Sequence, residues 1–498
     1  MPKVAKTARL KMELFVKELG PDCLTTDGTV LTCKLCAKVV NAEKKYSVQQ
    51  HLKSASHQER AKKTKDTDQT LCLLKNYVEL SSRESAFSMD LCEMMVQCNI
   101  PLHKAQHESF RRFLEKWSSE KKVPDPRTLR RNYLRKLYEA TMERIRNTVG
   151  DNRIWVSVDE TTDSRGQYVV NTVIGCLSAE EASKPMLMGC EIVERTNHAT
   201  IAQAFTNALS LLWPTGIKHE RVLLFISDAA PYMKKAGNGL SVLFPKMIHV
   251  TCLAHAVHRV CEEIRVSFPE VDSLIANVKK VFVKAPSRVQ VFREVAPSVP
   301  LPPAPVLSRW CTWLSAALYY ARNLNEITRV LAELDGSEAA AIRKSKELMV
   351  DPFVKSNLAS IASNYCRLPE SITRLECSSQ RLSITLGIVD EIRQSLIGGV
   401  GQKAELIRSK LERVLEKNAG FETVSMIQRA LEGEGLSDEI SSLSASELSS
   451  FTFAPLVSVD VERSFSRYKA LLSDRRYSLT AENVKHHIIG LCNVPVAE

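Results

Sequence analysis

Four potential metal ligands near the N-terminus constrain the fold of this chain more than any other feature of the sequence. Cys33, Cys36, His51 and His57 follow one another in the pattern Cys-x2-Cys-x14-His-x5-His. Zinc binds four nitrogen or sulfur ligands in a tetrahedron, and this pattern supplies two of each at a spacing that zinc modules use. The alternative is that four small core residues coincide by chance. The spacing favours a zinc site.

The residues around these ligands predict a small ββα-type zinc finger. Residues 29–32 and 39–40 have the pattern of two short strands on either side of the cysteine pair, and residues 46–54 have that of a helix carrying His51. A module this small has no sizeable core, so we expect the bound metal to provide much of its folding free energy. The finger and a basic tail are expected to occupy residues 1–65.

Positive charge is concentrated in the first third of the chain. Residues 1–150 hold 29 Lys and Arg against 18 Asp and Glu, which accounts for the whole net charge of +11. A basic region attached to a neutral body is typical of a polyanion-binding module, and double-stranded DNA is the polyanion that we expect. A set of solvated lysine-rich helices is the alternative.

Two groups of basic residues are candidate DNA contacts. Lys62 and Lys63 belong to a basic run after the finger that could contact phosphates or act as a nuclear import signal. Arg130 and Arg131 lie on a predicted helix, within a helical region expected over residues 70–150 for DNA binding or oligomerisation. A solvated linker and a solvated helix face explain the two groups nearly as well.

The same helical region contains an apolar stripe. Phe110, Leu114 and Trp117 recur at helical spacing. The spacing predicts an amphipathic helix with these side chains facing a core.

Composition places the chain among globular proteins. With 498 residues, 44% hydrophobic and 25% charged, it is long enough for more than one domain and too apolar to be disordered. No uncharged apolar run reaches the length of a membrane span, and the first residues lack an apolar signal core, so we expect a soluble protein made in the cytosol. The nuclear location that we expect goes with DNA binding and with the candidate import signal at Lys62 and Lys63. Fourteen scattered cysteines predict reduced thiols rather than a disulfide framework.

The middle of the chain alternates strand-like and helix-like segments. Apolar strand patterns occupy residues 154–158, 168–177, 185–193, 221–226 and 247–251. An amphipathic helix is expected between the third and fourth, capped by Thr200, with Ile201, Phe205, Leu209 and Leu212 on one face. Three consecutive strands followed by alternating helices and strands predict an α/β domain, in which helices pack on a mixed sheet.

Three carboxylates in this part of the chain are candidates for a catalytic metal site. Asp159 and Asp228 each close an apolar strand, and side chains at the ends of neighbouring strands project into one crevice. Glu462 lies beside the apolar stripe of a C-terminal helix. Carboxylates gathered in this way hold a pair of Mg²⁺ or Mn²⁺ ions that activates water for phosphodiester chemistry. The structural alternatives are turn or helix caps for the aspartates and an ion pair for Glu462.

These segments resemble the hAT family of DNA transposases. The resemblance covers most of residues 150–490 and is carried by Val158-Asp-Glu-Thr-Thr-Asp163, Ile226-Ser-Asp-Ala-Ala, Cys252-Leu-Ala-His255 and Val461-Glu-Arg-Ser-Phe-Ser. It implies an RNase H-like fold in which Asp159, Asp228 and Glu462 are the catalytic acids. Asp163 is a rival for the position of the first acid.

The same resemblance implies further roles and a helical insertion before the third acid. Cys252 and His255 would support the active site, and Trp310 would stack on an unpaired base at the cleavage point, although a core role for this tryptophan is as good an explanation. The 234 positions between the second and third acids are too many for a loop. The expected fold class is thus α/β plus α, with the RNase H-like core in residues 151–295 and 451–498, the insertion in 296–450, and dimerisation helices at the C-terminus.

The N-terminal third resembles a second family. From Val30 to about Tyr133 it is similar to the family of the CGG-triplet-repeat-binding protein, in the finger spacing, the Cys98-Asn-Ile-Pro-Leu segment and the Leu129-Arg-Arg region, and the finger looks like a divergent BED-type finger. Two functions follow from the resemblances. One is a homo-oligomeric transposase that cuts and joins DNA by two-metal hydrolysis and transesterification. The other is a domesticated, catalytically silent nuclear protein that regulates transcription.

Overall fold

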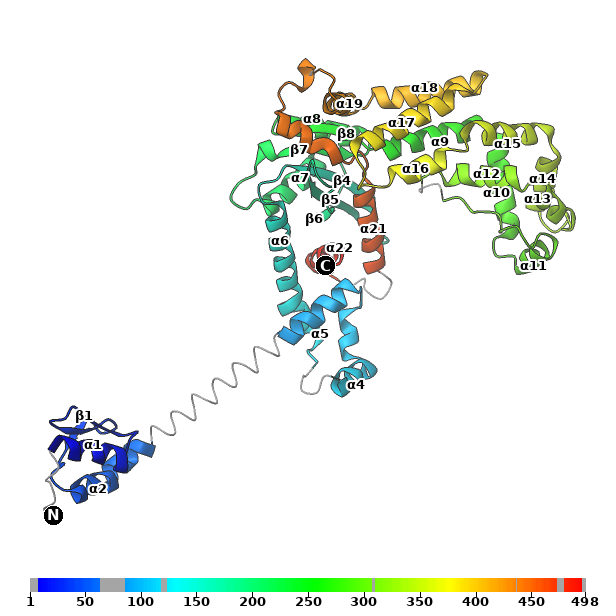
Figure 1. The fold of residues 1–498 in the computed structure, drawn as a ribbon. Coiled ribbons are helices and arrows are strands. Elements are labelled where there is room, and N and C mark those ends of the chain that lie inside the picture. Colours follow the sequence, from blue (N-terminus) through cyan, green and yellow to red (C-terminus); the bar gives the residue numbers. More distant parts are fainter. Residues whose placement is uncertain are drawn as a thin grey trace, which may run out of the picture. The chain divides into compact units, whose positions relative to one another are not determined.

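The computed structural model describes residues 8–62, 86–117, 123–306, 310–435, 437–472 and 479–494. The chain divides into two compact units, residues 1–90 with 111–123 and residues 91–110 with 124–498 (Figure 1). The candidate DNA contact Lys63 lies outside the described residues. None of the described helices is long and apolar enough to cross a membrane.

The first unit is built around a three-stranded antiparallel sheet with the order β1-β2-β3. Its elements are α1 (Ala8–Leu19), β1 (Leu24–Thr26), β2 (Leu31–Cys33), β3 (Lys38–Val40), α2 (Lys45–Lys53) and a helical stretch over residues 55–62. The two predicted strands and the predicted helix are present as β2, β3 and α2. Helix α1 and strand β1 are additions that the ββα pattern did not include.

These additions give the first unit a core of its own, contrary to expectation. Helix α1 contributes Met12 and Phe15, and the strands and α2 contribute the remaining buried apolar residues, namely Leu24, Leu31, Cys33, Cys36, Val40 and Val48. The β1–β2 connection is fixed by Asp27, whose carboxylate accepts the backbone N–H groups of Thr29 and Val30 at 2.8 and 2.9 Å. Those hydrogen bonds lower the pKa of Asp27 to about 2.

The second unit contains a five-stranded mixed sheet with the order β6-β5-β4-β7-β8. The strands are β4 (Ile154–Thr162), β5 (Tyr168–Cys176), β6 (Met186–Val193), β7 (Val222–Ser227) and β8 (Ile248–Thr251). Strands β4, β5 and β6 pair antiparallel, and β4, β7 and β8 run parallel. All five predicted strands are present, and the prediction of a mixed sheet with helices is confirmed.

Strand β4 continues beyond its predicted end. Pairing with β5 extends to Thr162 opposite Tyr168, because the carboxylate of Asp163 holds the turn between the strands together. Asp159 therefore lies within β4, opposite Asn171, and the prediction that it closes the strand was wrong.

Helices precede the sheet, cover it and form a large lobe after it. Residues 86–97 are helical, and the elements before the sheet are η1 (Leu102–Gln106), α4 (Glu108–Trp117), α5 (Pro126–Thr128), the π-helical η2 (Leu129–Leu134) and α6 (Arg135–Val149). Those within and directly after the sheet are α7 (His198–Leu212), η3 (His219–Arg221), α8 (Pro231–Ser241), α9 (Leu253–Ser267), α10 (Pro269–Phe282) and α11 (Pro286–Val295). The next are α12 (Thr312–Arg322), α13 (Leu324–Ala332), α14 (Ala340–Val350), α15 (Pro352–Tyr365), α16 (Leu368–Leu375), α17 (Leu382–Ile397), α18 (Gln402–Glu416) and α19 (Ala419–Leu431). The last are η4 (Asp438–Ile440), α20 (Ala445–Ser450), η5 (Phe451–Phe453), α21 (Val459–Leu471) and α22 (Ala481–Cys492).

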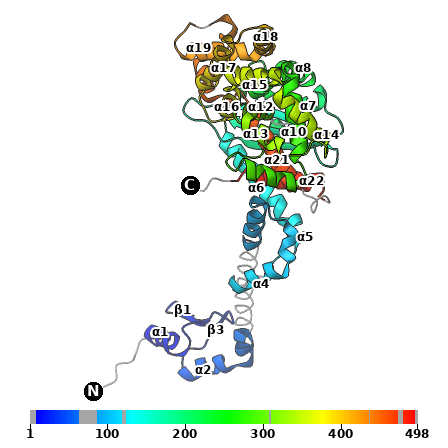
Figure 2. The same cartoon turned by 90° about the vertical axis from the view of Figure 1, so that its right-hand side faces the viewer.

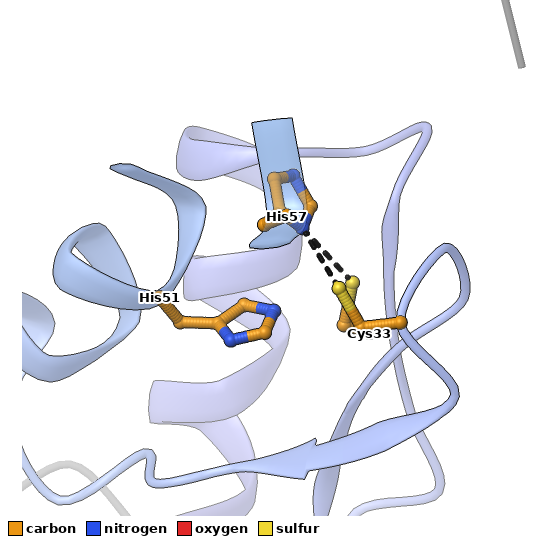
Figure 3. A group of neighbouring side chains, drawn as sticks. Cys33, His51 and His57 are labelled. Carbon is orange, nitrogen blue, oxygen red and sulfur yellow. Dashed lines mark hydrogen bonds between the residues drawn. The ribbon is translucent and has the colours of Figure 1, made fainter. Parts of the chain in front are cut away.

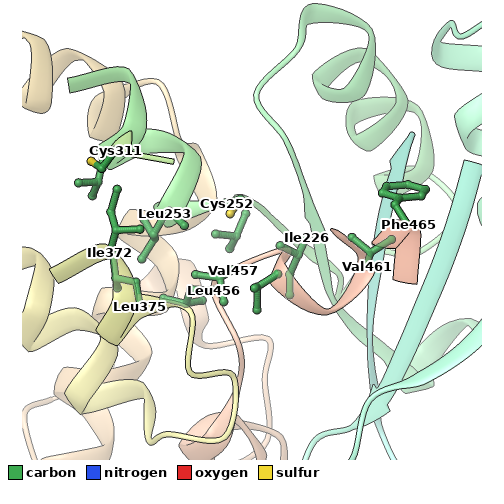
Figure 4. Packing of buried hydrophobic residues seen from close by; sticks show 14 of the residues in the cluster. Ile226, Cys252, Leu253, Cys311, Ile372, Leu375, Leu456, Val457, Val461 and Phe465 are labelled. Carbon is green, nitrogen blue, oxygen red and sulfur yellow. The ribbon is translucent and has the colours of Figure 1, made fainter. Parts of the chain in front are cut away.

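Within the second unit, α10 to α15 form a lobe that extends to the right of the sheet in Figure 1, and Figure 2 views the unit from the side of this lobe. One continuous apolar core nevertheless links the sheet to this lobe. Figure 4 shows the connection, in which Leu253 of α9 and Leu375 of α16 pack towards Leu456, and Ile226 of β7 packs near Val461 of α21. The helical part is therefore joined to the sheet by packing as well as by the chain.

Two asparagine side chains pair with the edge strands of this sheet as a neighbouring strand would. The Asn418 amide accepts the N–H of Thr251 in β8 and donates to its carbonyl, both at 2.8 Å. At the opposite edge, the Asn493 amide accepts the N–H of Leu187 in β6 at 3.0 Å and donates to its carbonyl at 2.9 Å. These bonds satisfy buried backbone groups that an open edge would leave unpaired.

Two expectations about helices need correction. The N-cap of α7 is Asn197, and Thr200 sits at the third helical position of a reciprocal capping box, although the predicted apolar face is buried. No residue of α4 is buried, and Trp117 is 71% exposed. Among the described residues, no element buries the stripe that Phe110 and Leu114 share with this tryptophan.

One disulfide modifies the expectation of reduced thiols. Cys261 of α9 and Cys311, just before α12, are joined, with their Cα atoms 6.0 Å apart. The other cysteines of the described residues are free. Within the described part of the chain this is the single disulfide, so the expectation of reduced thiols is wrong for Cys261 and Cys311.

Candidate functional site

The four predicted zinc ligands converge in the first unit. Their ligand atoms, from Cys33, Cys36, His51 and His57, all lie within 4.8 Å of one another. Figure 3 shows the His57 ring directed at the cysteine sulfurs, with the His51 ring beside it. Both cysteines and His57 are buried, and His51 is half-buried. The predicted Cys2His2 grouping is confirmed.

The distances fit a tetrahedral zinc ion. The Nδ1 atom of His57 lies 3.4 Å from the Sγ atom of Cys33 and 3.4 Å from that of Cys36. Zinc–sulfur and zinc–nitrogen bonds of about 2.3 and 2.05 Å at tetrahedral angles place sulfur and nitrogen roughly 3.5 Å apart. The Nε2 atom of His51 is buried without a hydrogen-bond partner, as expected for a nitrogen that faces a metal. Zinc therefore fits this donor set.

A break in the helical segment brings the two histidines together. An unbroken helix advances 100° per residue, so residues six apart would lie on different faces. Helix α2 ends at Lys53, and the next residue, Ser54, is its C-cap, with an extended ψ of 141°. The Ser54 hydroxyl donates to the carbonyl of His51 at 2.7 Å. A new helical turn then starts, and it carries His57 back to the cysteine pair.

The candidate DNA contacts are placed differently from one another. Lys62 and Arg131 are exposed to solvent. Arg130 is half-buried, and its Nε atom is buried without a hydrogen-bond partner. Of the described candidates, Lys62 and Arg131 are thus the ones whose charge is free to reach a phosphate.

In the second unit, Asp159 and Asp228 lie at the same level of adjacent parallel strands. Ser157 of β4 pairs in register with Ile226 of β7, so the positions two residues further on correspond as well. Asp228 follows directly after β7, and its carboxylate also accepts the N–H of Ala230 at 3.0 Å ahead of α8. The predicted meeting of the two strands is observed, together with the predicted turn role of Asp228.

The charges of four nearby side chains act on the carboxyl group of Asp159. Burial raises the pKa of the Asp159 carboxyl well above its usual range. His255 opposes this shift, and three carboxylates add to it, namely Glu462, Glu160 and Asp228. We call these five residues the carboxylate cluster. Four carboxyl groups thus lie around one histidine, and a cation bound among them would favour their ionised forms.

Glu462 reaches the cluster from the first turn of α21, which packs on β4 and β5. Its Oε1 atom accepts the hydroxyl of Ser458 at 3.1 Å and lies 3.7 Å from Nδ1 of His255. Burial raises the pKa of Glu462 to about 7. The backbone N–H of Ser458 donates to the Sγ atom of Cys252 at 3.2 Å. Cys252 and His255, one turn apart at the start of α9, therefore both contact the start of α21.

Trp310 lies beside the same histidine. Its ring is 5.2 Å from that of His255, centroid to centroid, in an edge-to-face arrangement. It is only partly buried against the apolar core. Trp310 therefore combines a packing role with a position next to the carboxylate cluster.

Asp163 has hydrogen-bond partners that give it a structural role in the turn between β4 and β5. Its carboxylate accepts the backbone N–H groups of Arg165 and Gln167 at 2.8 and 2.9 Å, the Nε–H of Arg165 at 3.3 Å and the hydroxyl of Tyr468 at 3.4 Å. Burial alone would raise its pKa, but these hydrogen bonds outweigh burial, and the pKa is lowered. Asp163 thus stabilises the β4–β5 turn, and of the two rivals Asp159 is the one in the cluster.

Sequence reasoning missed three residues at this site, namely Glu160, Tyr232 and Ser458. Glu160 follows Asp159 and hydrogen-bonds through Oε1 to the hydroxyl of Tyr232 in α8, while its Oε2 atom is buried without a partner. Ser458 links Cys252 to Glu462. A serine just before a predicted helix is a recognisable helix-start signal, but its partner Cys252 lies 206 positions away and no local pattern reveals that contact.

The carboxylate cluster has the type of ligands that a divalent metal ion prefers, but its ligand atoms are too far apart to coordinate one ion together. Among the described residues, only the Cys2His2 centre has three or more ligand atoms that all lie within 4.8 Å of one another. The Oε2 atom of Glu160 has no partner, and burial raises the pKa values of Asp159 and Glu462, so a bound cation would have to displace protons from these carboxyl groups. Binding of Mg²⁺ or Mn²⁺ would therefore require the carboxylates to draw together.

Two regions of the chain match described protein families. Residues 15–63 match the CGGBP1 N-terminal domain, and residues 124–281 match the domain of unknown function DUF659. CGG triplet repeat-binding protein 1 of Homo sapiens is 33% identical over 132 residues, which cover 25% of this chain and 78% of that protein. The protein of the same name from Mus musculus is also 33% identical over 132 residues. On this similarity, which extends over a quarter of its length, the chain belongs to the family of CGG triplet repeat-binding protein 1.

Proposed function

We propose that this protein binds double-stranded DNA through its zinc-containing first unit and that its second unit is of the hAT transposase type. The observation that carries the proposal is the Cys2His2 centre, because it stabilises a small unit in the basic third of the chain. The relatives are named as binding CGG triplet repeats, which supports DNA as the ligand. A role on DNA implies a nuclear location.

Several features of the second unit support the hAT-type assignment. The sheet has three antiparallel strands followed by two parallel ones in the order 3-2-1-4-5, which agrees with an RNase H-like arrangement. A long series of helices separates Asp228 from Glu462, as the resemblance implies. Helix α22 packs on β6, α6 and α21 of its own chain, so homo-oligomer formation, also implied by the resemblance, would use other surfaces or the exposed part of this helix.

The experiment compares two serine substitutions in the full-length protein. Cys36→Ser removes a ligand of the Cys2His2 centre, whereas Cys366→Ser changes an exposed free thiol at the end of α15. We expect Cys36→Ser to lower affinity for duplex DNA at least tenfold in a fluorescence anisotropy titration at fixed salt, because without zinc the helical segments that carry His51 and His57 are no longer held to the cysteine pair. Cys366→Ser should bind like the wild type. Equal affinity of all three proteins would refute the proposal.

The carboxylate cluster supports a second function, metal-dependent DNA cleavage. Asp159 and Asp228 lie level on adjacent strands, and Glu462 reaches them from α21. These three carboxylates would hold Mg²⁺ or Mn²⁺, which when bound would activate water and stabilise the leaving oxygen of a phosphodiester. His255 and Ser458 orient Glu462 through its Oε1 atom. None of the acids would become covalently attached to DNA.

Strand cleavage of end-labelled DNA tests this second function. Asp228→Asn removes the charge but retains an oxygen that can accept the Ala230 N–H, so the fold should persist. Asp390→Asn, on the exposed side of α17, is the matched control. Cleavage by the wild type and the control, but not by Asp228→Asn, is the expected result. Cleavage by none of them, with DNA binding intact, would favour the catalytically silent regulator instead.

A further inference from the structure

A polar pocket lies at the β8 edge of the sheet, and none of the residues lining it belongs to the carboxylate cluster. It has a volume of about 440 Å³ and is bounded by α8, β8 and the start of α19. The side chains that concern us are Lys234, Asn238 and Ser241 of α8, Lys417, which precedes α19, and Thr423 within it. The volume is in the range of small-molecule sites.

Two glycines allow the helices to approach β8 closely enough to form the walls of this pocket. A Cβ atom on Gly237 of α8 would lie 2.1 Å from the Nδ1 atom of His249. A Cβ atom on Gly420 of α19 would lie 2.1 Å from the carbonyl oxygen of the same histidine. Any other residue at either position would force a helix away from the strand.

Cations gather at this pocket without acidic partners. The ammonium group of Lys234 donates to the carbonyl of Lys417 at 2.8 Å. Burial lowers the pKa of Lys234, and the nearby charges of Arg259 and Lys417 lower it further. None of the described residues that line the pocket carries a carboxylate. Lys234 and Lys417 line it, and Arg259 lies near Lys234 without lining the pocket. An anion in the pocket would relieve their repulsion.

The start of α19 adds hydrogen-bond donors to the same pocket. Asn418 occupies the N-cap position, but its amide is engaged with Thr251 and makes no capping hydrogen bond. The N–H groups of the first turn of this 13-residue helix are therefore not capped by the side chain that usually does so. Ala419 and Gly420, which open the helix, line the pocket. Such a helix end favours negative charge and complements the two lysines.

We propose that this pocket binds a phosphate group, held by Lys234 and Lys417 and by the start of α19. Lysine ammonium groups and uncapped helix N–H groups are both donors suited to phosphate oxygens. The phosphate belongs either to the backbone of a DNA strand or to a free phosphate compound. The proposal does not depend on cleavage by the carboxylate cluster, since it uses none of those residues.

Protection of the two lysines from amine-reactive labelling tests the proposal in the full-length zinc-bound protein. Labelling would be quantified by peptide mass spectrometry with no addition, with inorganic phosphate, with chloride at the same ionic strength, and with duplex DNA. We expect Lys234 and Lys417 to be protected by phosphate, by DNA or by both, and not by chloride. Lys235, the exposed neighbour on α8 that does not line the pocket, should label equally with phosphate and with chloride.

Matched charge reversals complete the test. Lys417→Glu and Lys235→Glu change the net charge equally, and both side chains are exposed, so both proteins should fold. Lys417→Glu should lower the affinity for the ligand that protects the lysines about tenfold, as expected for the loss of one charge-assisted hydrogen bond. Lys235→Glu should leave protection unchanged. Protection by inorganic phosphate identifies a free phosphate as a ligand, and protection by DNA alone identifies a backbone phosphate. Absence of protection in both arms, or equal effects of the two reversals, would overturn the proposal.

Discussion

Replacing Asn418 by alanine should destabilise the second unit at the β8 edge of its sheet. The amide makes two hydrogen bonds of 2.8 Å with the N–H and carbonyl of Thr251, and both residues are buried. Alanine removes both partners and leaves two buried backbone groups unpaired. Each such group costs about 1–3 kcal/mol, so the free energy of unfolding should fall by about 2–6 kcal/mol.

The assay is hydrogen exchange of the Thr251 amide, combined with denaturant unfolding of the full-length protein. In Asn418→Ala, the Thr251 N–H should exchange at least tenfold faster, while amides in the centre of β4 change less. Asn357→Ala is the control, because its side chain makes a single 3.4 Å hydrogen bond to Glu270. A stability change of Asn418→Ala within about 0.5 kcal/mol of this control, or unchanged Thr251 exchange, would refute the reasoning.

Three further predictions concern single residues. Gly237→Ala should destabilise the protein by about 1–3 kcal/mol in denaturant unfolding, because the new Cβ atom would collide with His249. Gly239, on the same helix, faces open space, so Gly239→Ala should not destabilise the protein in this way. Equal effects of the two substitutions would contradict the close contact of Gly237 with His249. Burial lowers the pKa of His249 to about 4, so the folded state resists protonation of this side chain. The free energy of unfolding should be retained above pH 6.5 and fall by about 3 kcal/mol as the pH drops to 4. His249→Gln should lose this part of the pH dependence, and an unchanged pH profile of the variant would contradict the prediction. Asp163→Asn should cost about 1–2 kcal/mol in unfolding and leave duplex DNA affinity unchanged, because its carboxylate holds a turn; a neutral effect on stability would contradict that role.

The sheet could be predicted from the sequence because its strands are local apolar runs. All five strands were located, four of them to within one residue at each end. The end of β4 was missed, since its last residues, Asp159 to Thr162, are polar and pair because β5 lies opposite. The N-cap of α7 was misplaced by three residues, because Asn197 and Thr200 both have capping side chains and both take part in the capping box. The exposed face of α4 could not be predicted, since periodicity shows that a helix is amphipathic but not what covers it.

The two sites differ in how far the sequence reveals them. The Cys2His2 centre lies within 25 residues, so spacing alone locates it. The core that α1 adds was missed, because it depends on packing that no ligand spacing records. In the second unit, the level positions of Asp159 and Asp228 follow from adjacent parallel strands. The contacts of Ser458 with Cys252 and His255 join residues more than 200 positions apart, and only the folded chain shows them.

The most direct test of zinc-dependent DNA binding is a zinc back-titration of the metal-free full-length protein. Duplex DNA affinity and bound zinc would be measured together as zinc is added after chelation. DNA affinity should be lost without metal and should return in proportion to one zinc bound per chain, because the Cys2His2 centre organises the binding unit. Full DNA affinity in the metal-free protein would contradict this account.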